Sequence, residues 1–429
     1  MNDKFGYCFI LGNNHSLCKV EIINVLFSRK IDFKIVESSQ ETLIIEALTE
    51  IEKDLDIDIF GSIAKFVKIY KNLPLKPFLD GNNDDLVDYD FIDFFVPKDE
   101  KHPIFGLSVY GAGCRFKDLN TSWYLSPSFC RNLRDELKSY GIKNGFMPLR
   151  DRKLSTVSVD KNKLLTNGFE IILAIGHDTV YVGKTIAVQD YESYGFRDYG
   201  RPNRDSKSGM IPPKLAKMMI NLAGKNTDQT ILDPFCGSGT ILEELILLGY
   251  QKIIGSDLSP KAVNDTNVNL KWLFEKYPEL DPKKFDITTL NSDVTQISRV
   301  IKNKSIDAIV TEPFLGSPKR NFNFTQVHQE INRLVPLYTR AFSEFKKILS
   351  PSGTIVIISP VFRCQGKFLH LPILEKLKPL GFVPVDFLPR QYNTPENLAL
   401  LNLELTERNS IVYYRADQIV SREIFLFKV

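Results

Sequence analysis

Residues Ile231–Leu245 read ILDPFCGSGTILEEL, and this stretch decides how the rest of the chain is interpreted. An apolar run ends at Asp233, a turn with Gly237 and Gly239 follows, and a regular apolar pattern starts at Thr240. We expect a short strand, a tight turn and a helix that begins at Thr240. Glycines lack a Cβ atom, so a ligand can lie against the turn, and the unpaired N–H groups of the helix start favour a negative group of that ligand. The stretch therefore predicts a nucleotide-type site.

Two common nucleotide motifs do not fit this turn. The dinucleotide fingerprint needs a third glycine at the position of Leu242, and a phosphate-binding loop needs a Gly-Lys-Ser/Thr string, which this turn lacks. An acidic residue directly before the turn, Asp233, suits a ligand with a positive centre, such as the amino group and sulfonium of S-adenosylmethionine. The string DPFCGSGT at 233–240 resembles the first motif of amino-group methyltransferases. The alternative is a structural strand-to-helix turn with incidental glycines.

The composition is that of an ordinary globular protein. The chain has 429 residues, of which 43% are hydrophobic and 25% charged, so we expect two or three domains and little disorder. No apolar run is long enough for a membrane span and the first residues lack a signal-peptide pattern, so we expect a cytoplasmic protein without a membrane partner. The six cysteines are scattered without a CxxC pair, which argues against a zinc site or a disulfide framework. The net charge of +3 neither demands nor excludes a nucleic-acid partner.

The first 75 residues alternate strand and helix patterns. We expect the order βαββαβ, which is typical of a small α+β, ferredoxin-like unit. The predicted strands are Phe5–Leu11, Lys34–Val36, Thr42–Ala47 and Ile63–Tyr70, and the predicted helices are Asn13–Ser28 and Thr49–Leu55.

A second α+β region follows a polar stretch, Pro74–Asp93, that is rich in Pro, Asn and Asp and is interpreted as a linker. We expect a helix over Pro127–Tyr140 and strands over Ile104–Tyr110, Leu154–Val159, Gly168–Ile175 and Asp178–Val188. Basic residues gather beside the predicted strand Leu154–Val159, where they could follow a phosphate backbone. The alternative is a solvated surface interrupted by acids. They are Arg150, Arg152, Lys153, Lys161 and Lys163.

From Thr230 the chain repeats strand then helix, which is typical of a doubly wound parallel sheet. A bridging segment, Tyr191–Asp205, and a helix over Leu215–Ala223 precede it. The predicted strands are Thr230–Asp233, Lys252–Asp257, Asp286–Asn291, Ile306–Thr311 and Gly353–Ser359, and the predicted helices are Thr240–Leu248, Pro260–Lys276, Val294–Ile301 and Thr325–Leu349. The last two strands, Ser410–Tyr414 and Arg422–Val429, are expected to form an antiparallel hairpin at the sheet edge.

Three acids stand at successive strand ends. Ligands of open α/β sheets lie beyond the carboxyl ends of the strands, and Asp233, Asp257 and Asp293 follow the first, second and third strands there. Asp257 is placed to accept hydrogen bonds from both ribose hydroxyls, and Asp293 to accept one from the adenine amino group. Helix capping is the alternative role for Asp257 and Asp293.

The fourth strand runs into Glu312-Pro313-Phe314-Leu315. Amino methyltransferases carry Asp/Asn-Pro-Pro-aromatic at this place, because an exocyclic base amine is a poor nucleophile and must be held in line with the sulfonium methyl. We expect Glu312 and the carbonyl of Pro313 to hold the amine and Phe314 to stack the base. The departure from the usual string leaves a structural strand end as the alternative.

Taken together, these strings resemble the THUMP-domain tRNA guanine-N2 methyltransferases that modify the guanosine at the base of the D-arm. Beside the glycine motif, the resemblance rests on Phe9–Gly12 with the helix carrying Glu21, Leu154–Val157, Tyr181–Asp190, Arg197–Pro202 and Gly209–Ala216. It implies an N-terminal ferredoxin-like domain (1–75), a THUMP-like RNA-binding domain (85–190) and a Rossmann-like S-adenosylmethionine-dependent methyltransferase domain (191–429).

The resemblance also implies site residues and a tRNA substrate. Catalytic roles fall to Glu312, Pro313 and Phe314. Binding of S-adenosylmethionine falls to Asp233, Phe235, Gly237, Gly239, Thr240, Asp257, Leu258 and Asp293, with Asp233 and Gly237 near the methionine part. RNA contact falls to Arg150, Arg152, Lys153, Lys161 and Arg201.

Three functions stay open at this point. The first is methylation of guanosine N2 in tRNA, the second is methylation of ribosomal RNA guanosine or of adenine N6, and the third is RNA binding without catalysis. The sequence predicts neither the nucleotide modified nor the oligomeric state.

Overall fold

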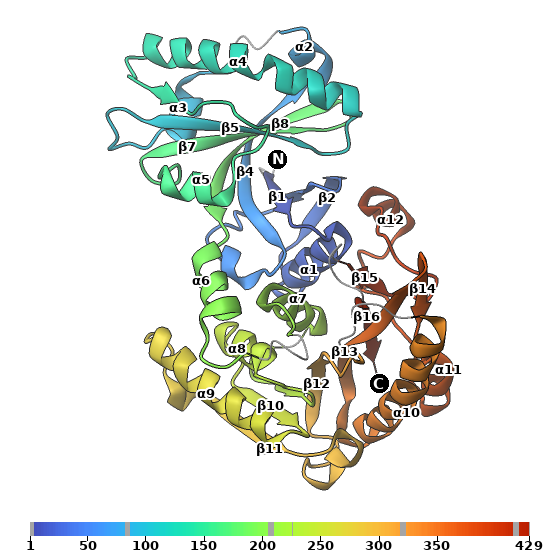
Figure 1. Cartoon of the computed structure of the whole chain (residues 1–429). Coiled ribbons are helices and arrows are strands. Elements are labelled where there is room, and N and C mark those ends of the chain that lie inside the picture. Colours follow the sequence, from blue (N-terminus) through green and yellow to red (C-terminus); the bar gives the residue numbers. More distant parts are fainter. Residues whose placement is uncertain are drawn as a thin grey trace. The chain divides into compact units, whose positions relative to one another are not determined.

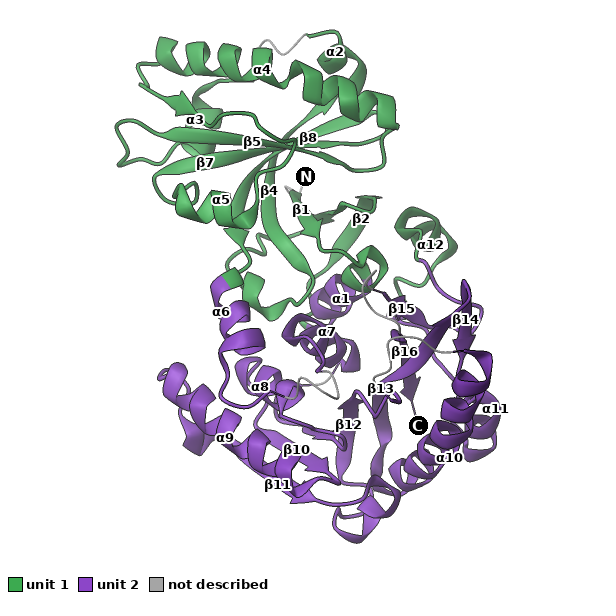
Figure 2. Ribbon diagram, in the orientation of Figure 1, with its two compact units in different colours: residues 1–19, 29–191, 390–403 green, residues 20–28, 192–389, 404–429 purple. Residues whose placement is uncertain are grey.

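The computed structural model describes residues 4–81, 86–204, 210–224, 226–317, 323–414 and 420–428. The chain divides into two compact units, shown in green and purple in Figure 2. The first unit comprises residues 1–19, 29–191 and 390–403, and the second comprises residues 20–28, 192–389 and 404–429. The division falls inside helix α1 (His15–Ser28), between Lys19 and Val20.

The first unit is built on an eight-stranded sheet with the order β2-β3-β1-β4-β8-β7-β5-β6 (Figure 1). Its strands are β1 (Phe5–Leu11), β2 (Phe33–Ser38), β3 (Thr42–Ala47), β4 (Ile63–Pro74), β5 (Ile104–Gly111), β6 (Gly145–Phe146), β7 (Gly168–Ile175) and β8 (Thr179–Val188). Its helices are α2 (Leu75–Leu79), α3 (Tyr89–Phe95), α4 (Phe116–Ser139), α5 (Thr156–Lys161), α12 (Pro395–Leu401) and the 3-10 helix η1 (Ile57–Ile59).

Strand β4 joins the two regions that the sequence separates. It pairs with β1 on one side and with β8 on the other, so strands from residues 1–75 and 85–190 lie in one sheet. The division of this part into a ferredoxin-like and a THUMP-like domain stays a prediction, and its boundary at residue 85 lies outside the described residues.

Two elements predicted for the first unit, a strand over Leu154–Val159 and a helix over Thr49–Leu55, are wrong. Leu154–Val159 is not a strand, because the Ser155 hydroxyl accepts a hydrogen bond from the Ser158 N–H (3.1 Å) and starts helix α5. Thr49–Leu55 forms turns, and η1 begins only after Asp56, whose carboxylate accepts from the Asp58 N–H at 2.9 Å.

The expected linker Pro74–Asp93 contains α2 and the start of α3. Phe78 and Phe91 of these helices are buried, so their apolar contacts outweigh the polar composition of the stretch. The helix predicted from Pro127 begins earlier, at Phe116, and contains Pro127 in its interior.

The second unit is built on a sheet with the order β11-β10-β9-β12-β13-β16-β15, which is parallel from β11 to β13. Its strands are β9 (Thr230–Asp233), β10 (Lys252–Asp257), β11 (Asp286–Asn291), β12 (Ile306–Thr311), β13 (Leu349–Cys364), β14 (Lys367–His370), β15 (Ile411–Tyr413) and β16 (Val420–Lys428). Its helices are α6 (Tyr191–Gly195), which begins at the unit boundary, the π-helix η2 (Phe196–Gly200), α7 (Pro213–Ala223), α8 (Thr240–Leu247), α9 (Pro260–Lys276), α10 (Phe324–Ile348), α11 (Leu374–Leu377) and the 3-10 helices η3 (Pro282–Lys284), η4 (Val294–Arg299) and η5 (Lys378–Leu380).

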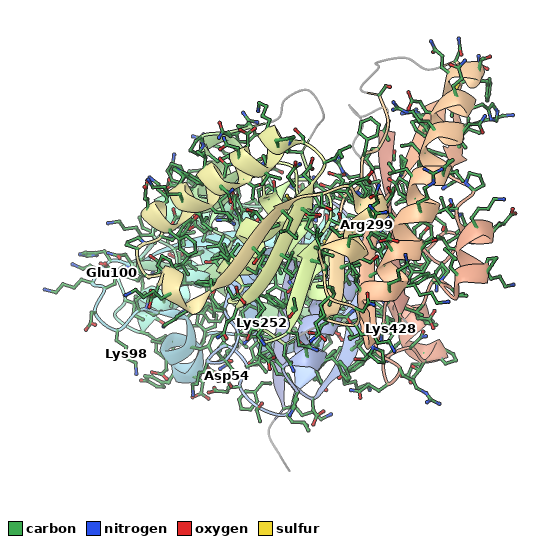
Figure 3. All side chains as sticks on the ribbon, turned by 90° about the horizontal axis from the view of Figure 1, so that it is seen from below. Asp54, Lys98, Glu100, Lys252, Arg299 and Lys428 are labelled. Carbon is green, nitrogen blue, oxygen red and sulfur yellow. The ribbon has the colours of Figure 1, made fainter. Side chains whose placement is uncertain are left out.

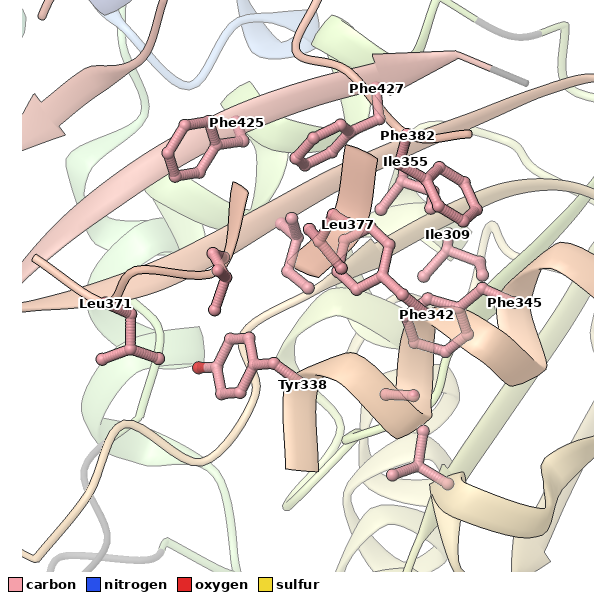
Figure 4. Close-up of a cluster of buried hydrophobic side chains, with 14 of the residues drawn as sticks. Ile309, Tyr338, Phe342, Phe345, Ile355, Leu371, Leu377, Phe382, Phe425 and Phe427 are labelled. Atoms are coloured by element: carbon pink, nitrogen blue, oxygen red, sulfur yellow. The ribbon is translucent and has the colours of Figure 1, made fainter. Parts of the chain in front are cut away.

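The doubly wound α/β fold predicted for this unit is confirmed. Helices α7, α8 and α9 pack against one another, with α7 on β12 and β13, α8 on β10, and α9 on β10 and β11. Helix α10 packs with η4 over β12 and β13. Figure 4 shows the core under α10, where the Phe342 ring contacts Phe345 of the same helix and Phe382 and Phe427 of the last segments. Burial of these apolar surfaces on folding holds the sheet and the helix together.

The last strands confirm the predicted antiparallel pair. Strand β16 lies between β13 and β15 and runs antiparallel to both, whereas Val429 lies outside the described residues. Strand β10 begins at Lys252 and β16 ends at Lys428, so the side seen in Figure 3 is the one opposite to the carboxyl ends of the parallel strands. The start of β16 therefore lies at the same edge as the ends of β9 to β12.

Candidate functional site

A cavity of about 610 Å³ opens beyond the carboxyl ends of β9, β10, β11 and β12. It lies where the strand order reverses between β10-β9 and β12, the place at which open α/β sheets bind ligands. Nearly all residues of the predicted cofactor and acceptor sites line it together. They are Asp233, Phe235, Gly237, Thr240, Asp257, Leu258, Asp293, Glu312, Pro313 and Phe314.

The glycine turn has the backbone that the sequence predicts. Gly237 and Gly239 have φ values of +53° and +92°, which side chains with a Cβ rarely adopt. A Cβ on Gly237 would meet only open space, which leaves the turn accessible to a ligand. Gly239 does not line the cavity, and a Cβ there would meet Thr266 at 3.0 Å, so its role is to begin helix α8 against α9.

Asp233 is buried at the end of β9. Its Oδ1 accepts hydrogen bonds from the Thr311 hydroxyl at 2.6 Å and from the Phe235 N–H at 3.1 Å. The pKa of this carboxyl rises from an ordinary 3.8 to about 7, chiefly because burial disfavours the charged form, and the neighbouring carboxylates of Asp257 and Glu312 contribute to the rise. A cationic group of a ligand in the cavity would favour the charged form.

Asp257 joins the glycine turn to the end of β10. Its Oδ2 accepts from the Gly237 N–H at 3.1 Å and its Oδ1 accepts from the Ser259 N–H at 2.8 Å. Each carboxylate oxygen has a further lone pair, so both can also accept from a ligand hydroxyl. Asp293 caps η4 by accepting from the Thr295 N–H at 2.8 Å, and it still lines the cavity, so capping and ligand binding are compatible there.

The acceptor side of the cavity contains an ion pair that the sequence analysis missed. Arg422 of β16 donates to Glu312 through Nε (2.5 Å to Oε1) and Nη2 (3.3 Å to Oε2). The same Nη2 donates to the carbonyl of Met210 at 3.4 Å, and all three residues line the cavity. The sequence contains one indication of this contact. A last strand that runs antiparallel to the other strands must start at the edge where the parallel strands end, which places Arg422 near the end of β12.

The loop after β12 is fixed to helix α10 by polar contacts. The Tyr338 hydroxyl donates to the carbonyl of Phe314 at 3.3 Å, and the Arg333 guanidinium lies 4.9 Å from the centroid of the Phe314 ring. Arg333 also donates to Glu330, which accepts from the Ser317 hydroxyl at 2.6 Å. These contacts hold Phe314 in place. Its side chain is still 40% exposed, so the ring remains accessible for stacking.

The predicted RNA-binding residues divide into three groups. Arg150 and Lys161 are exposed on the first unit. Arg152 and Lys153, on the same unit, both form ion pairs with Glu41, at 2.8 and 2.5 Å.

Arg201, on the second unit, is buried and forms an ion pair with Glu243 at 3.4 Å, so its assignment to a surface RNA contact is wrong. The glycine in Gly209–Ala216 and the last residue of the bridging segment Tyr191–Asp205 lie outside the described residues.

Within residues 4–81, 86–204, 210–224, 226–317, 323–414 and 420–428, no group of three His, Cys, Asp or Glu side chains is placed to hold a metal ion. Across the same ranges, none of the helices combines the length and apolar character needed to span a membrane.

Comparison with known proteins identifies the class of the second unit. Residues 201–380 match the family described as "RMKL-like, methyltransferase domain". These residues form a methyltransferase domain, and S-adenosylmethionine, the cofactor predicted from the sequence, is confirmed for it. The acid-lined cavity fits this molecule, because it offers carboxylates for a ribose and for positive groups.

Particular relatives confirm the resemblance stated from the sequence. The chain is 32% identical over 207 residues to a tRNA (guanine(10)-N2)-dimethyltransferase of Methanocaldococcus jannaschii, covering 42% of this chain and 54% of the relative. It is 26% identical to a tRNA (guanine(6)-N(2))-methyltransferase THUMP3 of Bos taurus, covering 47% of this chain and 37% of the relative. The chain thus spans about half the length of the first of these relatives and less of the second.

A solved structure shares the fold over almost the whole chain. TrmN from Thermus thermophilus superposes with a TM-score of 0.54 at 12% identity, covering 99% of both chains. At this identity, the likeness establishes the fold alone.

Proposed function

We propose that this chain transfers a methyl group from S-adenosylmethionine to the exocyclic N2 of a guanosine in tRNA. The methyltransferase domain at 201–380 and the tRNA guanine-N2 methyltransferases among its relatives support the reaction and the substrate. The single observation that carries the choice of base is the Glu312 carboxylate, which is ion-paired with Arg422 in the cavity.

A carboxylate distinguishes guanine from adenine by its hydrogen-bonding pattern. An ionised carboxylate only accepts hydrogen bonds, and each of its oxygens has two acceptor sites. Guanine presents two neighbouring donors, N1–H and the N2 amino group, whereas adenine presents its N6 amino group beside the N1 acceptor. Glu312, with one lone pair per oxygen given to Arg422, still has an acceptor on each oxygen for guanine. An asparagine amide would instead offer one acceptor and one donor, as adenine requires.

In the proposed reaction, different residues bind the cofactor, position the amine and stack the base. Asp233, Asp257 and Asp293 hold the cofactor, which supplies an electrophilic methyl group when bound. Glu312 and the Pro313 carbonyl accept from the N2 amino group and direct its nitrogen, while Phe314 stacks the base. In the transfer the N–C bond forms, the C–S bond breaks, and one N2 proton leaves toward Glu312 or water. Positioning is the main contribution, since the amine lone pair is delocalised into the ring.

Nucleoside mass spectrometry tests the proposal. Unmodified tRNA is incubated with the protein and S-adenosylmethionine, digested and analysed, with ribosomal RNA as a parallel substrate. N2-methylguanosine from tRNA is the expected product. Methyladenosine, methylation confined to ribosomal RNA, or tight RNA binding without any product would each overturn the proposal in favour of an alternative.

The isosteric change Glu312→Gln sharpens this test. The amide replaces one acceptor by a donor at nearly constant size, so guanosine methylation should fall while affinity for S-adenosylmethionine stays the same. The same proposal includes a cytoplasmic location, where tRNA would be met, and contact of tRNA with the exposed Arg150 and Lys161 of the predicted THUMP-like region.

A further inference from the structure

A short π-helix at the start of the second unit turns its arginines inward and its aromatic rings outward. In η2 and the residue after it, Arg197 and Arg201 are buried, and they form ion pairs with Glu244 at 2.6 Å and Glu243 at 3.4 Å on helix α8. π-helical turns are rare and are frequently found at functional sites. The buried charges fix the backbone of this turn and leave its other face to the solvent.

Two aromatic side chains of η2 are exposed, and each has a cation beside it. Tyr199 is 69% exposed, with the Arg204 guanidinium 5.0 Å from its ring centroid, and Phe196 is 47% exposed, with the Lys276 ammonium at 4.8 Å. Arg204 and Lys276 are exposed as well. We name these four residues the aromatic–cation surface.

This surface is tied to the methyl-donor cavity by hydrogen bonds. Arg201 donates to the sulfur of Met210 at 3.0 Å, and Met210 lines the cavity. The Asn269 side chain accepts from the N–H of Asn203 at 2.9 Å and donates to the carbonyl of Ser238 in the glycine turn at 2.8 Å. The backbone between Tyr199 and Arg204 is therefore held to the turn that binds the cofactor.

We propose that the aromatic–cation surface binds unpaired RNA nucleotides that flank the target nucleotide. Surfaces that bind single-stranded nucleic acid combine aromatic rings, on which bases stack, with basic side chains that meet the phosphates. A target base must leave any stack before it reaches a buried amine-binding site, so its neighbours are unpaired or easily unpaired. The charge of Arg204 and Lys276 is complementary to phosphate, and hydrogen bonds of Arg201 and Asn269 connect the segment that carries Tyr199 and Arg204 to Met210 and Ser238 of the cavity. The inference rests on the proposed function, because it assumes an RNA substrate.

Variants of the rings test the inference by direct binding. Tyr199→Ala and Phe196→Ala are measured by fluorescence anisotropy with an unmodified tRNA transcript and with a short single-stranded oligoribonucleotide, without turnover. Loss of a stacking ring costs about 1–3 kcal/mol, so Kd should rise about 5- to 150-fold for each variant. Tyr199→Phe, which keeps the ring, should restore binding. The oligoribonucleotide should compete better than duplex RNA of the same sequence.

Matched controls separate RNA contact from a structural role. Lys276→Gln should weaken RNA binding, whereas Lys271→Gln on the same helix should not, because Lys271 is paired with Glu275. Affinity for S-adenosylmethionine, measured by calorimetry, should be unchanged in all of these variants. Unchanged RNA affinity in Tyr199→Ala, or a parallel loss of cofactor affinity or thermal stability, would overturn the inference.

Its failure can be told apart from failure of the proposed function. If the wild type methylates no guanosine but Tyr199→Ala weakens RNA binding, the proposed reaction fails and the surface stands. If the wild type methylates tRNA and both alanine variants keep the wild-type KM for tRNA, the reaction stands and the surface fails.

Discussion

Asp233→Asn should stabilise the ligand-free protein at pH 8 while it weakens binding of S-adenosylmethionine. The carboxyl is buried at the end of β9, and its pKa rises from 3.8 to about 7 chiefly because burial penalises the charge. Because the folded-state pKa of Asp233 lies above the unfolded value, the stability that this carboxyl contributes is fully present below about pH 4. This contribution is lost as the pH rises through about 7. The shift corresponds to roughly 4 kcal/mol at pH 8, at 1.36 kcal/mol for each pH unit.

The asparagine removes this cost and keeps the hydrogen bonds to Oδ1. It can still accept from the Thr311 hydroxyl and the Phe235 N–H, which is why the gain should survive in practice. For a unit of this size, 1 kcal/mol shifts Tm by about 2–4 °C. We therefore expect a rise in Tm of roughly 8–16 °C at pH 8 and little change near pH 4.

Thermal unfolding of wild type and variant across this pH range provides the assay, with calorimetry for the cofactor. Asp286→Asn is the matched control, because Asp286 is an exposed aspartate in the same sheet and should change Tm little at either pH. A variant that is less stable than the wild type at pH 8 would show that the charge of Asp233 is compensated in the free protein, and would refute the reasoning. Wild-type affinity for S-adenosylmethionine in the variant would remove Asp233 from the cofactor site.

Three further substitutions test the remaining sides of the cavity. Asp257→Ala should weaken S-adenosylmethionine binding about 10- to 100-fold, as expected for lost hydrogen bonds to a charged group; unchanged affinity by calorimetry would remove Asp257 from the ribose site. Glu312→Ala should leave that affinity unchanged and lower kcat by ~10²–10³, the scale of losing one transition-state contact, and normal turnover would contradict the assignment of the β12 end. Arg422→Met should lower kcat about tenfold through misplacement of Glu312, with recovery in Arg422→Lys; a change in cofactor affinity alone would argue for a different role.

The sequence predicts the parts of this protein that depend on local patterns. The glycine turn, the helix from Thr240 and the acids at the strand ends follow from spacing along a few residues, because parallel strands bring their carboxyl ends to one edge. The strand predicted over Leu154–Val159 is wrong for an equally local reason: its alternating apolar residues fit a strand, but the Ser155 cap favours a helix.

What could not be predicted depends on partners distant in the sequence. Arg201 lies in a polar, arginine-rich segment and looks like a surface residue, yet Glu243 on α8 neutralises it in the interior. Charge in a sequence does not report burial, because a buried ion pair needs a partner that only the fold supplies. The same holds for Arg152 and Lys153, which meet Glu41 from another part of the first unit.

The unusual acceptor string, Glu312–Leu315, is explained by its contact with Arg422, a residue distant in the sequence. Glu312 is one methylene longer than the aspartate of the usual motif, and a longer side chain has more rotamers to lose before it can hold an amine. Arg422 removes that freedom by binding both oxygens, and it can do so because β16 runs antiparallel and begins beside the end of β12. On the other side, Tyr338 and Arg333 of α10 fix the Phe314 backbone and ring. Both residues that differ from the common motif, Glu312 and Phe314, are thus held in position by side chains from outside the motif. This argues for a retained amine-binding site rather than a degenerate one.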